Sequence, residues 1–347
     1  MNDFTIVFDR PEGYCPGENV SGRVVIQACT PIETRYLKIC IHGIAHTKWG
    51  EGIDEHYSEQ NYVSGEKIAW VANDGSGTLP AGHHIFPFSF SLPVGCPPSF
   101  KGLHGNVSYY VRMELDKPRP WKANKVEKSY FTVVSNSSLD LSSPENGPII
   151  KKDEKQVGVL FNKGSVSLEA TIPKQRWASG EYLPITVNIV NNSKRPQTCL
   201  RAKLLQHSNY FSICKPTSSS HLKQHNSDCK VVSMSKKNIN VVAGAESQEK
   251  LKISIPKITP SFNSPLITVH YSLMVMLDTN SSSSLSCEFN VVLVASPDTT
   301  RPTIGRSESL PPPYSDSILN APPYSEVASS ENASKSPPSY ESTMFTV

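Results

Sequence analysis

The chain repeats itself with a shift of 163 residues, and this repeat restricts the folds open to it. Residues 14–26 and 177–189 read alike: an aromatic residue, a short turn, Gly-Glu, and then alternating apolar and polar residues. With a shift of 162, the Pro-Ser-Phe at 98–100 recurs at 260–262. Alternation common to any two strands explains the matching apolar positions, but not Gly-Glu and Pro-Ser-Phe together. The sequence therefore predicts two related domains in tandem.

A two-residue apolar period marks strands in both copies. Residues 84–92 place three phenylalanines and Leu92 on one side of the chain, with proline and serines on the other. Residues 165–172 and 269–277 alternate in the same way, which is the pattern of a half-buried strand. No stretch of ten or more residues holds a clean helical period between caps. We predict an all-β fold with two immunoglobulin-like β-sandwich domains.

Composition shifts divide the chain further. Residues 135–155, rich in Ser, Asn, Pro and Lys, predict a connector, and residues 216–228 predict an exposed loop inside the second domain. Residues 301–347 hold 8 prolines and 11 serines in 47 positions, too few apolar residues to offset the entropy of ordering, so we expect a disordered tail. The predicted parts are an N-terminal sandwich at 1–140, a linker at 141–160, a C-terminal sandwich at 161–296 and the tail at 297–347.

Charge and hydropathy exclude some classes of function. The 34 basic and 31 acidic residues leave a net charge of +3, too small an excess to predict nucleic-acid binding. The longest apolar runs have about five residues, whereas a membrane-spanning helix needs about 20, so we expect no transmembrane segment. Residues 1–10 lack the basic start and apolar stretch of a secretory signal. We therefore expect a cytoplasmic protein.

The cysteines and histidines predict no catalytic or metal site. The eight cysteines form no CxxC pair, and in the cytosol we expect reduced thiols, mostly buried. His221, His225, Asp228 and Cys229 lie close in sequence, but their neighbours are loop-like and a structural metal is not predicted. Gly75-Ser76-Gly77 lacks the lysine of a phosphate loop and is interpreted as a turn. We predict no catalytic residues, no metal and no cofactor, hence no enzyme.

The tail carries two copies of the PPxY motif, in which two prolines preset a polyproline II turn for an aromatic groove and the tyrosine fills a neighbouring pocket. This is the pattern of WW-domain ligands. Composition alone would place roughly 0.08 such motifs in the chain, so two copies are not accidental. The predicted WW-binding residues are Pro311, Pro312, Tyr314, Pro337, Pro338 and Tyr340.

A third, weaker candidate consists of Pro322, Pro323 and Tyr324, where Ala321 replaces the first proline. The two full motifs are 26 residues apart, for which a flexible chain spans about 30 Å, so two WW domains of one partner could be engaged together. Phosphorylation of Tyr314 or Tyr340 would bring about −2 charge into an apolar pocket and is expected to abolish docking.

The motifs, in this order, resemble the alpha-arrestin, or arrestin-domain-containing, family over most of residues 4–296 and the tail. They are Tyr14-Cys-Pro-Gly-Glu-Asn-Val-Ser-Gly22, Arg35-Tyr-Leu-Lys-Ile39, Phe86-Pro-Phe-Ser-Phe-Ser-Leu-Pro93, Pro98-Ser-Phe-Lys-Gly-Leu-His-Gly105, the Gly180-Glu181 strand entry with Asn191-Asn-Ser193, and the PPxY tail. The last strand, 289–296, departs from the family's Pro-Ile-x-Ile-Gly pattern. The resemblance implies two arrestin-type β-sandwiches hinged by a linker.

Members of this family are non-enzymatic adaptors. The resemblance implies that the tail recruits Nedd4-type HECT E3 ubiquitin ligases, while the body binds membrane receptors or transporters as cargo. Cargo ubiquitination, endocytosis and endosomal or lysosomal sorting would follow, with the protein recruited from the cytoplasm to the plasma membrane and endosomes through its partners.

Two alternatives remain open. The first is an arrestin-fold endosomal sorting scaffold that is not coupled to a ubiquitin ligase; the doubled PPxY favours the ligase adaptor over it. The second is a thiol-redox regulator, which would require one exposed cysteine with a depressed pKa.

Overall fold

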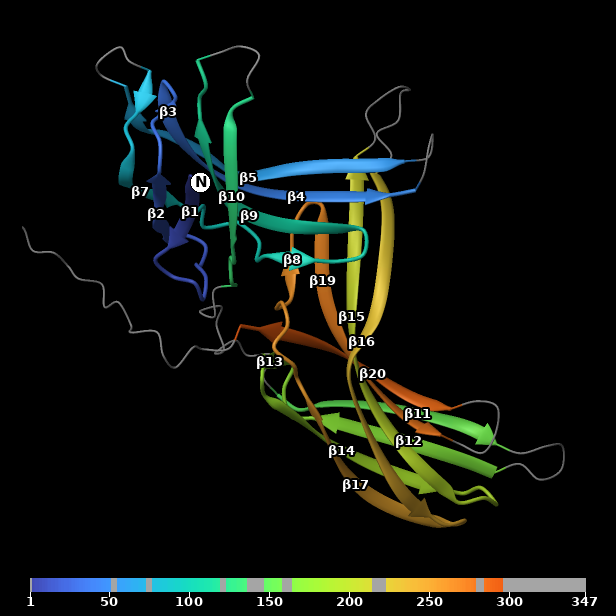
Figure 1. Cartoon of the computed structure of the whole chain (residues 1–347). Coiled ribbons are helices and arrows are strands. Elements are labelled where there is room, and N and C mark those ends of the chain that lie inside the picture. The colour runs from blue at the N-terminus through green and yellow to red at the C-terminus, as the bar shows by residue number, and fades with distance from the viewer. Residues whose placement is uncertain are drawn as a thin grey trace, which may run out of the picture. The chain divides into compact units, whose positions relative to one another are not determined.

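The computed structural model contains only β-strands in the part of the chain that it describes (Figure 1). The all-β prediction is therefore confirmed. The strands form two lobes, an N-lobe from β1 to β10 and a C-lobe from β11 to β20, and both belong to one compact unit. The described residues are 2–50, 55–72, 77–118, 123–135, 147–157, 164–213, 223–278 and 284–295.

The N-lobe is built from a three-stranded sheet in the order β1-β2-β7 and a sheet in the order β10-β9-β4-β5, with β8 also paired to β9. A short pair joins β3 to β6. All of these pairings are antiparallel. The strands are β1 Asp3–Phe8, β2 Asn19–Ala28, β3 Ile32–Glu33, β4 Tyr36–Trp49, β5 His56–Val71, β6 Thr78–Leu79, β7 Gly82–Ser91, β8 Phe100–Lys101, β9 Gly105–Leu115 and β10 Lys125–Phe131.

The C-lobe repeats this plan with one sheet in the order β11-β12-β14-β17 and a second in the order β13-β20-β19-β15-β16, with β18 paired to β19. Only β13 and β20 pair in parallel among these described strands. The strands are β11 Ile149–Val157, β12 Gly164–Ile172, β13 Arg176–Ala178, β14 Tyr182–Asn191, β15 Gln197–Ile213, β16 Lys223–Val241, β17 Ala245–Ser254, β18 Phe262–Asn263, β19 Ile267–Asp278 and β20 Leu285–Val294.

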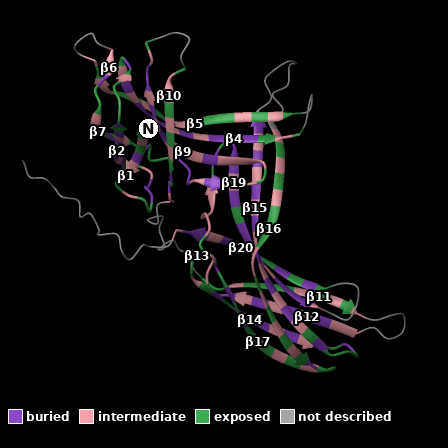
Figure 2. Cartoon of the chain, viewed as in Figure 1, coloured by how far each residue is buried: buried purple, intermediate pink, exposed green. Residues whose placement is uncertain are grey.

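Burial alternates along the strands as the sequence predicts (Figure 2). On β12, Val166 and Leu168 are buried and their neighbours are half-buried. On β7, Phe88 is buried while Pro87 and Ser89 are exposed. The last strand, β20, also alternates, with Phe289 and Val291 buried. Branched and aromatic side chains on the inward faces supply the hydrophobic free energy that holds each lobe together.

The sequence repeat extends to individual hydrogen bonds at the strand entries. In the N-lobe, the Cys15 amide donates to Oε2 of Glu18 at 2.7 Å, and in the C-lobe the Ala178 amide donates to Oε2 of Glu181 at 2.9 Å. The glycine before each glutamate has a φ of 87° or 93°, a left-handed conformation that other residues rarely adopt. The Gly-Glu pair is thus a turn with its own carboxylate cap, present once per lobe.

A second repeated contact follows the Pro-Ser-Phe motif. The Tyr109 hydroxyl donates to the Pro97 carbonyl at 2.7 Å, and the Tyr271 hydroxyl donates to the Thr259 carbonyl at 2.5 Å. Both tyrosines are buried, so each hydroxyl needs a partner, and the loop before the motif supplies it. The same register in both lobes supports the duplication.

Two polar segments form strands that the sequence did not predict. Residues 149–157, placed in the connector by composition, form β11, which pairs with β12. Residues 223–228, placed in an exposed loop, begin β16 and pair with β15. Both β11 and β16 are edge strands, held by backbone hydrogen bonds on one side and largely exposed, so little apolar alternation is needed. The exact domain boundaries stay a prediction.

Candidate interaction site

The predicted WW-binding residues lie beyond the described residues. They stay predictions, and the same holds for the weaker third motif. These positions are Pro311, Pro312, Tyr314, Pro337, Pro338 and Tyr340, with Pro322, Pro323 and Tyr324.

Within the described residues, the two lobes meet where the end of β15 reaches β4 and β5 (Figure 1). The Thr47 hydroxyl on β4 donates to the Phe211 carbonyl at 2.8 Å. The hydroxyls of Ser58 on β5 and Ser212 on β15 lie 3.1 Å apart. Thr47 and Ser212 are buried. The junction is therefore hydrogen-bonded, and it also holds an aromatic contact, since the rings of Phe100 and Phe262 meet across it with 5.6 Å between centroids.

Tyr210 is the centre of this junction. Its side chain is fully buried, and its hydroxyl donates to Oδ1 of Asp228 at 2.6 Å and accepts the Leu103 amide at 3.0 Å. The His104 ring packs edge-on against it, with 5.4 Å between ring centroids. Burial, reinforced by Asp228, raises the pKa of Tyr210 to about 12, so the phenol stays protonated at neutral pH and keeps donating to the carboxylate.

Gly102 allows Tyr210 to occupy this place. A Cβ atom at residue 102 would overlap the Tyr210 hydroxyl and would lie 2.8 Å from Cε1 of Phe100. Within the Lys-Gly-Leu-His-Gly segment at 101–105, the close approach of Tyr210 therefore requires glycine at position 102. Sequence reasoning missed Tyr210, because nothing local in its strand distinguishes it from another buried aromatic residue.

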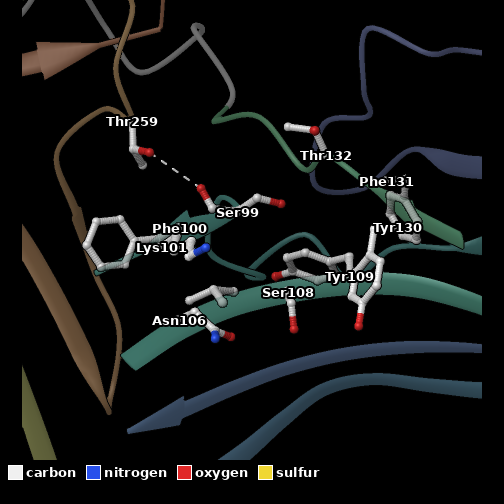
Figure 3. A pocket seen from close by; sticks show the side chains of 11 residues that line it. Ser99, Phe100, Lys101, Asn106, Ser108, Tyr109, Tyr130, Phe131, Thr132 and Thr259 are labelled. Atoms are coloured by element: carbon white, nitrogen blue, oxygen red, sulfur yellow. Dashed lines mark hydrogen bonds between the residues drawn. The ribbon is translucent and has the colours of Figure 1, made fainter. Parts of the chain in front are cut away.

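A pocket of about 640 Å³ opens beside the junction, between β8 and the end of β10 (Figure 3). Phe100, Tyr130 and Phe131 contribute aromatic walls, and Lys101 is the charged residue of the lining. Thr259 reaches the pocket from the C-lobe, and its hydroxyl donates to the Ser99 carbonyl at 3.5 Å. Aromatic walls with scattered hydroxyls suit the binding of a polypeptide segment better than acid–base chemistry. The full lining is Ser99, Phe100, Lys101, Asn106, Val107, Ser108, Tyr109, Tyr130, Phe131, Thr132 and Thr259.

The surroundings of five cysteines raise the pKa of the thiol, which gives no support to redox chemistry at these positions. Cys15, Cys40, Cys96 and Cys287 are buried, whereas Cys29 and Cys229 are exposed, and Cys214 lies outside the described residues. Burial raises the pKa of the thiols of Cys40, Cys96, Cys199, Cys229 and Cys287. A raised pKa disfavours the thiolate that thiol exchange needs.

The residues considered for a metal are separated by the strand geometry of β16. His225 is exposed and Asp228 half-buried, three positions apart, so they face opposite sides, and Asp228 instead accepts from Tyr210. His221 lies outside the described residues. Among the residues with described positions, no group of three or more His, Cys, Asp or Glu side chains could hold a metal ion. Gly75 and Ser76 also lie outside, and Gly77 has a φ of 58°, as in a turn.

Two β-sandwich lobes with duplicated strand entries and a hydrogen-bonded junction fit an arrestin-type protein. Comparison with known proteins agrees: the family model described as "Arrestin (or S-antigen), N-terminal domain" matches residues 4–140, and the C-terminal domain model matches residues 162–298. The chain belongs to the arrestin family, in its alpha-arrestin branch.

Named relatives cover most of the chain. Arrestin domain-containing protein 4 of Homo sapiens is 29% identical over 301 residues, which are 82% of this chain and 69% of that protein. The Mus musculus protein of the same name is 29% identical over 295 residues, 81% of this chain and 68% of its own length. Thioredoxin-interacting protein of Homo sapiens is 25% identical over 308 residues, 84% of this chain and 74% of that protein.

Family membership supports an arrestin-type adaptor, since arrestin-family proteins are non-enzymatic adaptors with protein partners. In the part of the chain that the structure describes, there is no helix that is long and apolar enough to cross a membrane.

Proposed function

We propose that this chain is a non-enzymatic adaptor that brings Nedd4-type HECT E3 ubiquitin ligases to membrane receptors or transporters. Ubiquitination of that cargo then promotes its endocytosis and its sorting through endosomes to lysosomes. The observation that carries the proposal is the combination of an arrestin body with two complete PPxY motifs in one tail.

The tail supplies the ligase side of the proposal. In each motif the prolines preset the extended conformation that a WW groove accepts, which reduces the entropy lost on binding. The tyrosine ring then fills the adjacent pocket. Two motifs allow two WW domains of one ligase to bind together, which raises avidity by about 10² or more.

The arrestin body supplies the cargo side. The pocket beside its junction offers aromatic surface and hydrogen-bonding groups, the combination that specific peptide recognition uses. On this proposal the protein is cytoplasmic and is recruited to the plasma membrane and endosomes by its partners.

The decisive experiment measures binding of the purified full chain to a tandem WW fragment of a Nedd4-type ligase. Tyr314→Ala and Tyr340→Ala are each expected to weaken binding by more than the statistical factor of two, and the double variant is expected to abolish it. Tyr324→Ala is the matched control, because its motif lacks the first proline. If the wild-type chain does not bind, the sorting scaffold without a ligase becomes the better account.

A further inference from the structure

Two histidines stack on the outer face of the larger C-lobe sheet: His207 on β15 and His270 on β19, here called the histidine pair. The register places them directly opposite each other on neighbouring antiparallel strands (Figure 1). Their rings are nearly parallel, with 4.8 Å between centroids and 9° between planes. The backbone pairing of β15 with β19 therefore holds two imidazoles together.

The histidine pair can be reached from solvent. His270 is exposed and His207 is half-buried, whereas the residues that follow them, Ser208 and Tyr271, are buried on the opposite face of the sheet. A small ion can approach both rings without displacing a core side chain.

Ser272 fixes the orientation of one ring. Its hydroxyl oxygen lies 2.8 Å from Nε2 of His207, and Ser272 is buried, so the serine is itself held in place. With the proton on Nε2, the serine oxygen accepts it and the lone pair of Nδ1 is left for a metal ion. Histidines that bind metals are commonly oriented by a second hydrogen bond of this kind.

The surroundings of His270 favour the neutral ring, which is the form that binds metal. Contact with neighbouring side chains removes water from part of the ring and lowers the pKa of His270, and His207 lowers it further. The rings repel each other when both are protonated, whereas neutral rings can share a cation. A metal ion therefore has an advantage over protons at this pair near neutral pH.

Two is the number of metal ligands that the fold brings together here. Cys229 lies opposite His207 on β16, but desolvation, together with nearby Asp228 and Glu288, raises the pKa of its thiol and keeps it protonated. In the described part of the chain, no third His, Cys, Asp or Glu side chain joins the pair in a group that could hold a metal ion. Water completes the coordination shell, so the site is an open chelate and not a closed structural site.

We propose that the histidine pair binds a divalent transition-metal ion such as Zn²⁺ or Ni²⁺, with one imidazole nitrogen from each strand as ligand. Imidazole suits these ions, whereas Mg²⁺ and Ca²⁺ take oxygen ligands. Binding requires a rotation of the rings, because parallel rings direct their nitrogens alongside each other and not toward one point. The bound ion links β15 to β19 close to Tyr210, which pairs with Ile267 on the same two strands. This site goes beyond the proposed function and does not rest on it.

The test is calorimetric titration of the purified full chain with NiCl₂ and with ZnCl₂. We expect His207→Gln and His270→Gln each to lower the affinity at least about tenfold, and the double variant to lose little more, because either change already destroys the chelate. His83→Gln is the matched control, since it removes an exposed histidine from β7, and it is expected to change the affinity less than twofold. Metal sites elsewhere on the chain remain in all variants, so the difference measures the pair alone.

Thermal unfolding gives a second readout and shows, without metal, that each variant is folded. An ion concentration of ten times Kd should raise the unfolding midpoint of the wild-type chain by about 3 °C, and MgCl₂ should have no effect. The shift should vanish in both single variants, and in the wild type at about pH 5, where imidazoles are protonated. Wild-type affinity in either single variant, a shift that persists in the double variant, or no binding of Ni²⁺ and Zn²⁺ to the wild type would each overturn the site. No ligase or cargo takes part, so the WW-domain result is independent of this one.

Discussion

The hydroxyl of Tyr210 accepts the backbone amide of Leu103 at 3.0 Å, and this hydrogen bond joins one lobe to the other. The same hydroxyl donates to Asp228, so it has a hydrogen-bond partner both as acceptor and as donor. A buried tyrosine held this way ties the loop that follows β8 to the hairpin of β15 and β16. Changes at this contact should therefore affect the junction before they affect either core.

Replacing Gly102 by alanine should destabilise the protein by about 1–3 kcal/mol, because the new methyl group would overlap the buried Tyr210 hydroxyl. Urea denaturation measures the effect. Gly95→Ala is the control, since a Cβ there meets no atom within 4 Å, and it should stay within about 0.5 kcal/mol of wild type. If the two variants have the same free energy of unfolding, the junction rearranges to accept the methyl group without loss of stability.

Tyr210→Phe should cost about 1–3 kcal/mol, because it removes one partner from the Asp228 carboxylate and from the Leu103 amide while keeping the ring. Tyr57→Phe is the matched control: its hydroxyl also bonds a carboxylate, that of Glu59, but the side chain is exposed. If both variants lose the same small amount of stability, Tyr210 has no special part in the junction.

Stability should fall at alkaline pH. The pKa of Tyr210 is raised to about 12, so the folded state holds this proton more tightly than the unfolded state, where a tyrosine titrates near 10. The stabilisation is complete below about pH 10 and is lost as the pH rises toward 12. Denaturation from pH 8 to 11.5 should show a shallower decline in Tyr210→Phe than in wild type. Parallel curves would contradict the assignment. Burial also raises the pKa of Tyr109 and Tyr271, and their contributions persist in both proteins.

The duplicated caps predict equal effects in the two lobes. Glu18→Ala and Glu181→Ala each remove a carboxylate that accepts a backbone amide at the strand entry, and each should cost about 1–2 kcal/mol. The two turns share no partner, so the double variant should lose the sum, as measured by thermal unfolding. A large loss from only one variant would show that the caps have different roles.

The strands that pack a core could be predicted from sequence, whereas edge strands and the junction could not. Phe86 to Leu92 and Val166 to Ile172 alternate because one face of each strand is buried. Lys151 and Lys152 on β11 show no such signal, because an edge strand needs only backbone pairing on one side. Tyr210 and Asp228 are 18 residues apart and Leu103 is in the other lobe, so their meeting depends on the tertiary structure.

The repeat could be recognised in the sequence because the turn at each strand entry requires the same Gly-Glu pair. Gly17 and Gly180 adopt positive φ angles, and the glutamate after each accepts an amide three residues before it. These requirements depend on local geometry, so they leave a signal in sequence.

Phosphorylation of Tyr314 should abolish binding of its motif to a WW domain, because a phosphate brings about −2 charge to a side chain that must enter an apolar pocket. Peptides covering residues 306–320 provide the comparison: unmodified, phosphorylated at Tyr314, and phosphorylated at Ser309 as the control of equal charge. We expect at least a hundredfold loss for phosphorylated Tyr314 and less than a fivefold change for phosphorylated Ser309, measured by calorimetry against one WW domain. If the Tyr314 phosphopeptide binds as tightly as the unmodified one, the tyrosine does not enter the pocket and cannot serve as a switch for ligase recruitment.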